Sequence, residues 1–134
     1  MRRVILVDTS VWIDWFRGNE TEQCEELDNL LEARADLAVC GPIAMELLQG
    51  VTSSSEWKRV KSLIDNLIWY DTEENFYIKS AAIYNSLRKS GITIRKSIDC
   101  LIATIAIENQ LIILHSDRDF DKIDKNSEIE TRIP

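Results

Sequence analysis

The chain has 134 residues, 45% of them hydrophobic, and a formal net charge of −7. This is the length of one domain, with enough apolar residues to bury a core. Three cysteines without a Cys-x-x-Cys pair exclude a full disulfide framework and favour a reducing cytoplasm. The single histidine excludes paired-histidine catalysis within one chain, so carboxylates are the residues available for chemistry. The acidic balance argues against a broad phosphate-binding surface.

The N-terminal third of the chain is predicted to be a strand, two helices and a strand. Residues 4–7 are a β-branched apolar run, typical of a strand that is buried on both faces. Helices are predicted over residues 11–17 and from residue 19. The side chains that cap them would be Thr9 or Ser10 for the first, and Asn19 with Glu22 reciprocating for the second. Residues 37–40 form a second buried strand.

The middle of the chain is predicted to be mainly helical. Gly41-Pro42 breaks the second strand and opens a helix to about Gly50, because proline suits the first turn. Ser53 and Glu56 have the spacing of a capping box and start another helix. The apolar side chains that this helix is expected to bury are Trp57, Val60, Leu63, Ile64 and Leu67. Residues 67–70 predict a third strand, and residues 72–89 a longer helix.

The C-terminal third contains the most apolar helix. Residues 98–107 are apolar nearly all round, so this helix should lie in the centre of the molecule. Residues 111–114 predict another buried strand, and the polar remainder from Lys122 ends in one short edge strand at 129–133. Continuously apolar strands that alternate with helices predict a small parallel sheet between helices. Residues 1–134 are expected to form one α/β domain, and no apolar stretch approaches the ~20 residues of a membrane-spanning helix.

Two aspartates follow predicted strands. Asp8 ends the first strand, and Asp117 comes a few residues after the strand at 111–114. Ligands bind at the carboxyl edge of parallel sheets, so these two carboxylates can share one site. Either residue alone is more often an ordinary loop or cap residue.

Asp99 is the only charged residue of the apolar helix at 98–107. An isolated buried carboxylate costs several kcal/mol unless it is protonated, paired or bound to a cation. Ala103 and Ala106 line the same helix face and leave room for an ion and a phosphate. The alternative is a first-turn aspartate that the helix dipole favours, with Ser97 as the cap.

Glu46 lies among apolar residues of the helix after Gly41-Pro42, and an exposed glutamate there would need no explanation. Together, Asp8, Glu46, Asp99, Asp117 and the Ser10 hydroxyl could converge on one sheet edge. Such carboxylates would repel one another without a cation, whereas Mg²⁺ or Mn²⁺ would find a set of hard oxygen ligands. A site of this kind suits metal-assisted hydrolysis of a phosphodiester bond.

Four segments resemble, in family order, the motifs of PIN-domain ribonucleases. They are residues 4–13 (VILVDTSVWI), 42–50 (PIAMELLQG), 99–103 (DCLIA) and 114–120 (LHSDRDF). Each motif alone is weak, but four in order are specific. The small size and the Thr93-Ile94-Arg95 lead into Asp99 look most like the VapC toxins of bacterial toxin–antitoxin pairs.

The resemblance implies a three-layer α/β/α fold and an endoribonuclease that depends on Mg²⁺ or Mn²⁺ and often acts on transfer or ribosomal RNA. It implies Asp8 and Asp99 as the principal metal ligands, Glu46 and Asp117 as completing the acidic site, and Ser10 as a hydrogen-bonding residue within it. Asp117 is preferred to Asp119 as the fourth acidic residue, with Asp119 behind it. Such toxins commonly form homodimers, and an antitoxin inhibits them by filling the active-site groove with its C-terminal segment.

The densest basic group lies shortly before Asp99 and could hold RNA phosphates: Arg88, Lys89, Arg95 and Lys96. Arg88 and Lys89 also suit a helix C-terminus. Trp12, Trp15 and Phe16 could stack on bases or form a dimer face, but this spacing is more typical of core residues. We expect His115 to be a structural hydrogen-bond donor and the cysteines to be buried.

Two other functions compete with the nuclease hypothesis. A non-catalytic PIN-like module would bind RNA or protein without a metal. A site that had lost its activity would have no reason to keep all four carboxylates, Asp8, Glu46, Asp99 and Asp117, which argues against this alternative. A phospho-acceptor signalling domain would need a lysine at the end of a late strand. Here the late strand runs into His115-Ser116-Asp117, with no lysine until Lys122.

Overall fold

A computed structural model describes residues 3–126 and 130–132, with side chains over residues 3–123. The described strands form one sheet in the order β3-β2-β1-β4-β5, and all four pairings are parallel. The strands are β1 (Ile5–Val7), β2 (Leu37–Cys40), β3 (Ile68–Tyr70), β4 (Ile112–Leu114) and β5 (Glu130–Arg132). The predicted parallel sheet is confirmed.

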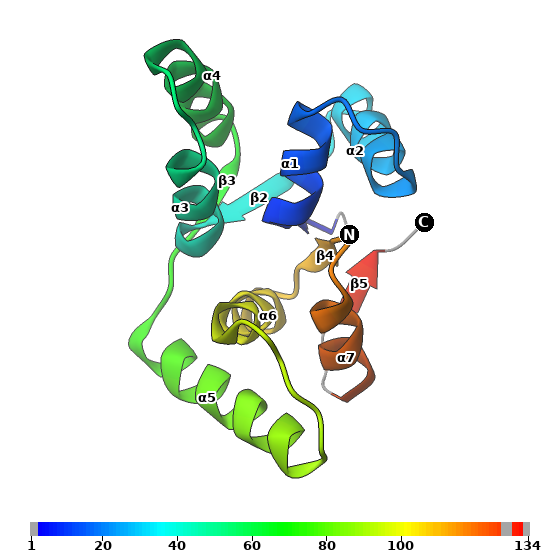
Figure 1. The fold of residues 1–134 in the computed structure, drawn as a ribbon, viewed down its shortest axis with the longest axis vertical. Helices are drawn as coiled ribbons and strands as arrows, with labels where there is room; N and C mark the ends of the chain where they lie inside the picture. The colour runs from blue at the N-terminus through cyan, green and yellow to red at the C-terminus, as the bar shows by residue number, and fades with distance from the viewer. Residues whose placement is uncertain (1–2, 127–129, 133–134) are drawn as a thin grey trace.

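Helices cover both faces of the sheet. They are α1 (Thr9–Phe16), α2 (Glu22–Glu32), α3 (Gly41–Gln49), α4 (Ser54–Asp65), α5 (Glu74–Lys89), α6 (Ser97–Asn109) and α7 (Arg118–Asn126). Figure 1 shows α1, α2 and α4 above the sheet and α5, α6 and α7 below it. The expected three-layer α/β/α arrangement is therefore confirmed. None of the helices in the described ranges is long and apolar enough to cross a membrane.

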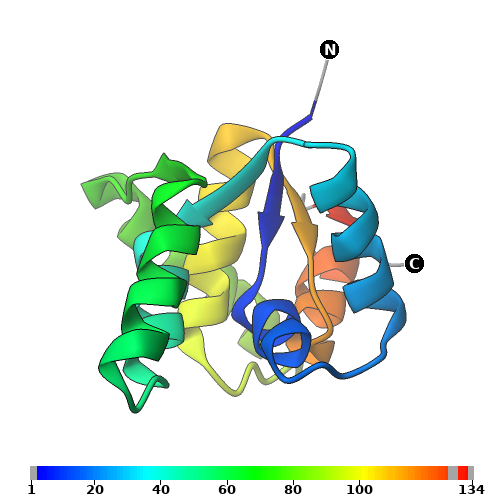
Figure 2. The ribbon, with the colours of Figure 1, turned by 90° about the horizontal axis from the view of Figure 1, so that it is seen from above.

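The central strands and α6 form the core. β1 and β2 are buried along their whole length, and β1 lies between β2 and β4. Figure 2 shows β2, β1 and β4 running in one direction, with α1 beginning where β1 ends. Every residue of α6 from Asp99 to Ala106 is buried, which confirms the central position predicted for this helix.

Two of the predicted helix caps are wrong, and one is confirmed. Asp8, rather than Thr9 or Ser10, caps α1 by accepting a hydrogen bond from the Ser10 backbone N–H. Thr21 caps α2 by accepting the Cys24 N–H at 3.0 Å, whereas the Asn19 side chain, two residues before that cap, donates to Asp14 Oδ1 at 2.9 Å. Ser53 caps α4 as predicted, accepting from the Glu56 N–H at 3.1 Å.

One more predicted cap, Ser97, and one predicted core residue, Trp57, also differ from expectation. Ser97 is the first residue of α6 and not its cap, since Lys96 occupies that position. Trp57 is 47% exposed, because its first-turn position in α4 lies beyond the core cluster that includes Val60 and Ile64. The side chains of β3 are exposed or half-buried, in keeping with an edge strand.

α7 was not expected from the sequence. It begins at Arg118 and takes up part of the segment read as a polar remainder. Phe120 and Ile123, three residues apart, are fully buried and hold this helix to the core. The short edge strand predicted at 129–133 corresponds to β5, although residues 129 and 133 lie outside the described part. The first turn of α7 thereby lies at the carboxyl edge of the sheet.

Candidate active site

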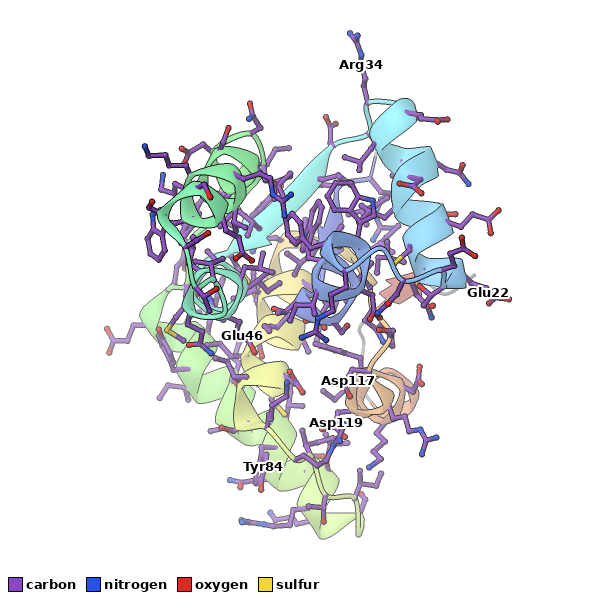
Figure 3. All side chains as sticks on the ribbon, turned by 45° about the horizontal axis from the view of Figure 1, so that its top comes forward. Glu22, Arg34, Glu46, Tyr84, Asp117 and Asp119 are labelled. Carbon is purple, nitrogen blue, oxygen red and sulfur yellow. The ribbon has the colours of Figure 1, made fainter. Side chains whose placement is uncertain are left out.

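The site is built where two central strands end. β1 and β4 pair in parallel, and the Asp8 N–H donates to the Leu114 carbonyl at 2.9 Å, which aligns the chain beyond both strands. β1 therefore delivers Asp8 to the edge of the sheet to which β4 and the start of α7 deliver Asp117 and Asp119. The start of α6 brings Asp99 to this edge, and α3 brings Glu46. Figure 3 shows Glu46, Asp117 and Asp119 on their elements.

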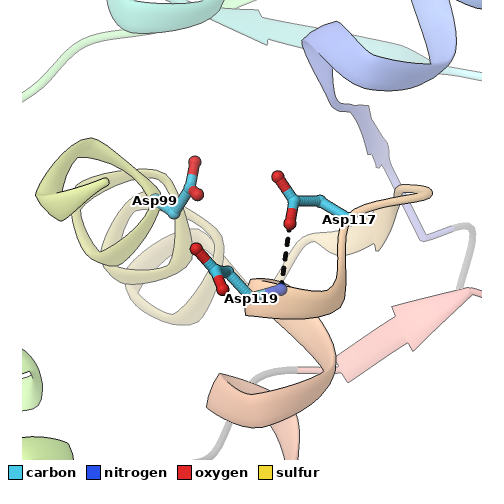
Figure 4. Close-up of side chains that lie close together, drawn as sticks. All are labelled: Asp99, Asp117 and Asp119. Carbon is cyan, nitrogen blue, oxygen red and sulfur yellow. Dashed lines mark hydrogen bonds between the residues drawn. The ribbon is translucent and has the colours of Figure 1, made fainter. Parts of the chain in front are cut away.

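Asp99, Asp117 and Asp119 form a compact group, which we call the aspartate trio. One carboxylate oxygen of each lies within 4.8 Å of the others (Figure 4). The Asp119 N–H donates to Asp117 Oδ1 at 2.9 Å, so the first turn of α7 fixes two members of the trio relative to each other. Asp99 and Asp119 are buried, and Asp117 is half-buried.

Two oxygens of the trio have no hydrogen-bond partner among the described residues. Asp99 Oδ2 and Asp119 Oδ1 are buried and make no hydrogen bond. Burial raises the pKa of Asp99 to about 7; Lys96 opposes this rise, and the charges of Asp8, Asp117 and Asp119 add to it. Three carboxylates at this spacing, with unpartnered buried oxygens, are a donor set that fits a hard divalent cation such as Mg²⁺ or Mn²⁺.

Asp8 lies outside the trio and is held by Ser10. Ser10 donates to Asp8 Oδ2 from its hydroxyl at 2.6 Å and from its backbone N–H at 3.1 Å. The same hydroxyl accepts the Ser116 N–H at 3.2 Å, so Ser10 joins the chain after β1 to the chain after β4. Burial raises the pKa of Asp8, and the Ser10 hydrogen bonds work against that rise.

Glu46 is also held by a neighbouring hydroxyl. Thr9 Oγ1 donates to Glu46 Oε1 at 3.2 Å, and Lys96 Nζ lies 4.0 Å from Glu46 Oε2. Sequence reasoning did not assign a site role to Thr9. Its place directly after Asp8, at the end of a buried strand, was the signal available.

Arg95 and Lys122 bring positive charge to the trio. The Arg95 backbone N–H donates to Asp119 Oδ2 at 3.0 Å, and its Nη2 donates to Asp117 Oδ1 at 3.1 Å. Lys122 Nζ lies 3.6 Å from Asp119 Oδ1. Arg88 instead contacts Asn85 and the Tyr84 ring within α5, which fits the helix-terminal role weighed for it.

Asp119 is more central than the sequence indicated. We expected it behind Asp117, but its side chain is fully buried within the trio. Its position in the first turn of α7 depends on that helix, which the sequence reasoning did not identify. Phe120 and Ile123 are its local sign, but two apolar residues are too short a pattern to predict a helix.

Two grooves flank the acidic residues. The first, of about 550 Å³, lies beside the trio and is lined by Ser10, Arg95, Ser116, Asp117, Arg118, Asp119 and Lys122. The second, of about 230 Å³, lies between α1, α3 and α4 and reaches Glu46. The first groove presents cationic side chains beside carboxylates, as a phosphate-binding path next to a metal would.

His115, Trp12 and the cysteines are buried in the fold. His115 is buried, and its Nδ1 accepts the Asp117 N–H at 3.2 Å, so in this contact it accepts where we expected it to donate. Burial lowers the pKa of His115 and favours the neutral ring. Trp12 is fully buried, as predicted for a core residue, and all three cysteines are free and buried.

Comparison with known proteins agrees with this geometry. Residues 5–126 match the PIN domain family. Two relatives are 38% identical over 122 residues, covering 90% of this chain and 91% of theirs: VapC ribonuclease Mb1587 of Mycobacterium bovis and ribonuclease VapC11 of Mycobacterium tuberculosis. A crystal structure of DNA-bound VapBC from Salmonella typhimurium has the same fold, with a TM-score of 0.72 at 24% identity and 98% of both chains covered.

Proposed function

Because this chain belongs to the PIN domain family and, within it, to the VapC ribonucleases, we propose that it is a metal-dependent endoribonuclease that hydrolyses RNA phosphodiester bonds. The observation that carries the proposal is the aspartate trio, whose buried oxygens Asp99 Oδ2 and Asp119 Oδ1 accept no hydrogen bond from the described residues. Residues 1–134 act as a single nuclease domain in the cytoplasm, where three buried free cysteines stay reduced.

The acidic residues divide the work of binding and proton transfer. Asp99, Asp117 and Asp119 would hold Mg²⁺ or Mn²⁺, and Asp8 would complete the ligand set from the β1 side. When bound, the ion polarises a phosphate oxygen and lowers the pKa of a bound water. Glu46, whose Oε1 is fixed by Thr9, orients the attacking water and accepts its proton.

The groove beside the trio is the path of the RNA backbone. Arg95, Arg118 and Lys122 line it, and Lys96 lies between Glu46 and Asp99. Cations placed in this way hold phosphates and position the strand without reading its sequence. Transfer or ribosomal RNA is the substrate class that the family resemblance implies.

Cation-dependent cleavage tests the function. Purified protein should cut RNA in the presence of Mg²⁺ or Mn²⁺, and EDTA should abolish cleavage until the ion is restored. Asp8→Asn and Asp99→Asn should each remove the activity. Full cleavage by both variants would refute the site, and RNA binding without cleavage at any cation concentration would identify a non-catalytic module.

We further propose that the protein is the toxin of a toxin–antitoxin pair. Its antitoxin would place a C-terminal segment in the groove between α1, α3 and α4, whose end reaches Glu46. Expression of the wild type should arrest growth, and co-expression of the protein encoded by the adjacent gene should relieve the arrest. Expression of Asp8→Asn should not arrest growth, and arrest by this variant would contradict a nuclease toxin.

We also propose a homodimer. Large exposed apolar side chains lie on α3, α4, β3 and α5: Met45, Trp57, Ile68, Trp69, Tyr77 and Ile78. Large apolar side chains exposed in this number are candidates for a subunit interface. Light scattering should give twice the mass of the chain, and Ile78→Asp should shift that mass toward the monomer. A monomeric wild type would refute the dimer.

A further inference from the structure

Arg95 contacts the aspartate trio in two different ways. Its backbone N–H donates to Asp119 Oδ2 at 3.0 Å. Its guanidinium donates through Nη2 to Asp117 Oδ1 at 3.1 Å and places Nε 3.5 Å from Asp119 Oδ2. One residue therefore supplies both a fixed main-chain donor and a movable cation to the same pair of carboxylates.

The main-chain contacts are sufficient to position the two carboxylates. Asp119 keeps the Arg95 backbone N–H, and Asp117 keeps the Asp119 backbone N–H at 2.9 Å. Neither contact involves the guanidinium. Removal of the Arg95 side-chain charge should therefore leave Asp117 and Asp119 where they are.

The exposed position of the Arg95 guanidinium allows it to dissociate from Asp117 and Asp119. The Arg95 side chain is 69% exposed, whereas those of Asp117 and Asp119 are 13% and 0% exposed. An ion pair with one solvated partner is weak. Arg95 already lines the groove beside the trio, and its long side chain can turn within it toward Ser10 and Ser116. Lys122, in contrast, is tied by its Nζ to the Thr93 carbonyl at 3.4 Å.

A divalent cation and the guanidinium would compete for the same oxygens. Both need the negative charge of Asp117 and Asp119, and like charges a few ångströms apart repel each other. Carboxylates already neutralised by arginine are also poorer metal ligands.

We propose, building on the metal-dependent activity proposed above, that Arg95 is a built-in competitor of the divalent cation. Its guanidinium and the ion occupy Asp117 and Asp119 in turn. Binding of the ion releases the guanidinium into the groove lined by Ser10, Ser116 and Arg118. Arg95 thus couples loading of the ion to the presentation of a phosphate-binding group.

Titration calorimetry with MnCl₂ tests the exchange. Arg95→Gln removes the charge and keeps the backbone donor, so it should bind Mn²⁺ about fivefold more tightly than the wild type. The matched control is Lys79→Gln, which breaks another cross-element ion pair, with Glu108 at 2.7 Å, away from the trio. The control should bind Mn²⁺ like the wild type.

A second readout follows the side chain itself. In ¹⁵N-arginine-labelled protein, the Arg95 Nε–H resonance, identified by its absence in Arg95→Gln, should shift on addition of Mg²⁺. The corresponding resonance of Arg88, which pairs with Asn85, should not shift.

The outcomes separate this inference from the nuclease proposal. Weaker Mn²⁺ binding by Arg95→Gln would mean that the guanidinium positions the ligands, and unchanged binding would mean that it does not compete; either overturns the exchange. Tighter binding without RNA cleavage by any form would support the exchange and refute the nuclease. A wild type that binds no Mn²⁺ would refute both.

Discussion

The acidic site has two parts that differ in how their carboxylates are satisfied. Asp8 and Glu46 each accept a hydrogen bond from a hydroxyl of the α1 start, Ser10 and Thr9 respectively. The aspartate trio instead leaves Asp99 Oδ2 and Asp119 Oδ1 without a hydrogen bond. One part is held by hydroxyls of the chain, and the other keeps two buried oxygens that could bind a cation.

This difference distinguishes the residues that bind the ion most strongly, the aspartate trio, from Glu46, which acts on the attacking water. A buried carboxylate without a partner is costly, so the trio gains the most from a divalent cation. The carboxylates fixed by hydroxyls are already positioned by the chain: Glu46 can act on a water, and Asp8 can complete the ligand set from the β1 side. Variants on the two sides of this division should therefore fail in different ways.

The largest effect is expected from Asp99→Asn. This change removes the central charge of the trio, so RNA cleavage should fall about 1,000-fold, the scale of losing a major electrostatic contribution to catalysis. Initial rates on a labelled RNA measure it. Asp65→Asn, at an exposed ion pair with Lys61 on α4, is the matched control and should retain wild-type rates. Near-normal cleavage by Asp99→Asn would remove the trio from the catalytic site.

Asp119→Asn and Glu46→Gln test the division directly. Asp119→Asn should weaken Mn²⁺ binding about tenfold to 100-fold, because it removes a charged ligand from the buried group. Glu46→Gln should bind Mn²⁺ within about twofold of the wild type and still lose cleavage, since proton transfer contributes about 100-fold or more. Calorimetry and cleavage rates on the same samples decide this. Equal losses of Mn²⁺ affinity in both variants would refute the distinction between ion binding by the trio and proton transfer by Glu46.

Thr9→Val should have a smaller effect. It removes the hydroxyl that fixes Glu46 Oε1 and keeps a similar shape, so cleavage should fall about tenfold with Mn²⁺ affinity unchanged. Thr9→Ser, which restores a hydroxyl, should recover most of the rate. Failure of the serine variant to recover would show that Thr9 acts through packing alone.

The smallest effect is on stability. The folded-state pKa of Asp99 is raised from 3.8 to about 7, so in EDTA the folded protein binds more protons than the unfolded chain between these values. Stability should therefore fall as pH rises from about 4 to 7, and Asp99→Asn should flatten this fall. Thermal unfolding in EDTA measures the difference as several degrees in Tm. A wild-type profile that Asp99→Asn leaves unchanged would mean that Asp99 ionises without cost.

The sequence was informative where local pattern and tertiary position agree. The apolar runs of β1 and β4 and the two aspartates beyond them placed Asp8 and Asp117 at one sheet edge, as observed. Residues 37–40 were predicted as a strand with the bounds of β2. A charge within an apolar helix identified Asp99 as unusual because its burial follows from the helix.

The sequence did not predict the features that depend on packing between elements. α7 rests on two buried residues, Phe120 and Ile123, among charged ones, which is too short a pattern to predict a helix. The central place of Asp119 depends on that helix. The contacts of Glu46 with Thr9 and of Arg95 with Asp117 join residues 37 and 22 positions apart, and no local pattern predicts them.

The position of a bound ion tests the central claim most directly. Crystals grown with MnCl₂ should show an anomalous peak coordinated by oxygens of Asp99, Asp117 and Asp119, with Glu46 still bound to Thr9. No peak at the trio, at Mn²⁺ concentrations that support cleavage, or a peak held without Asp99, Asp117 and Asp119, would contradict the account.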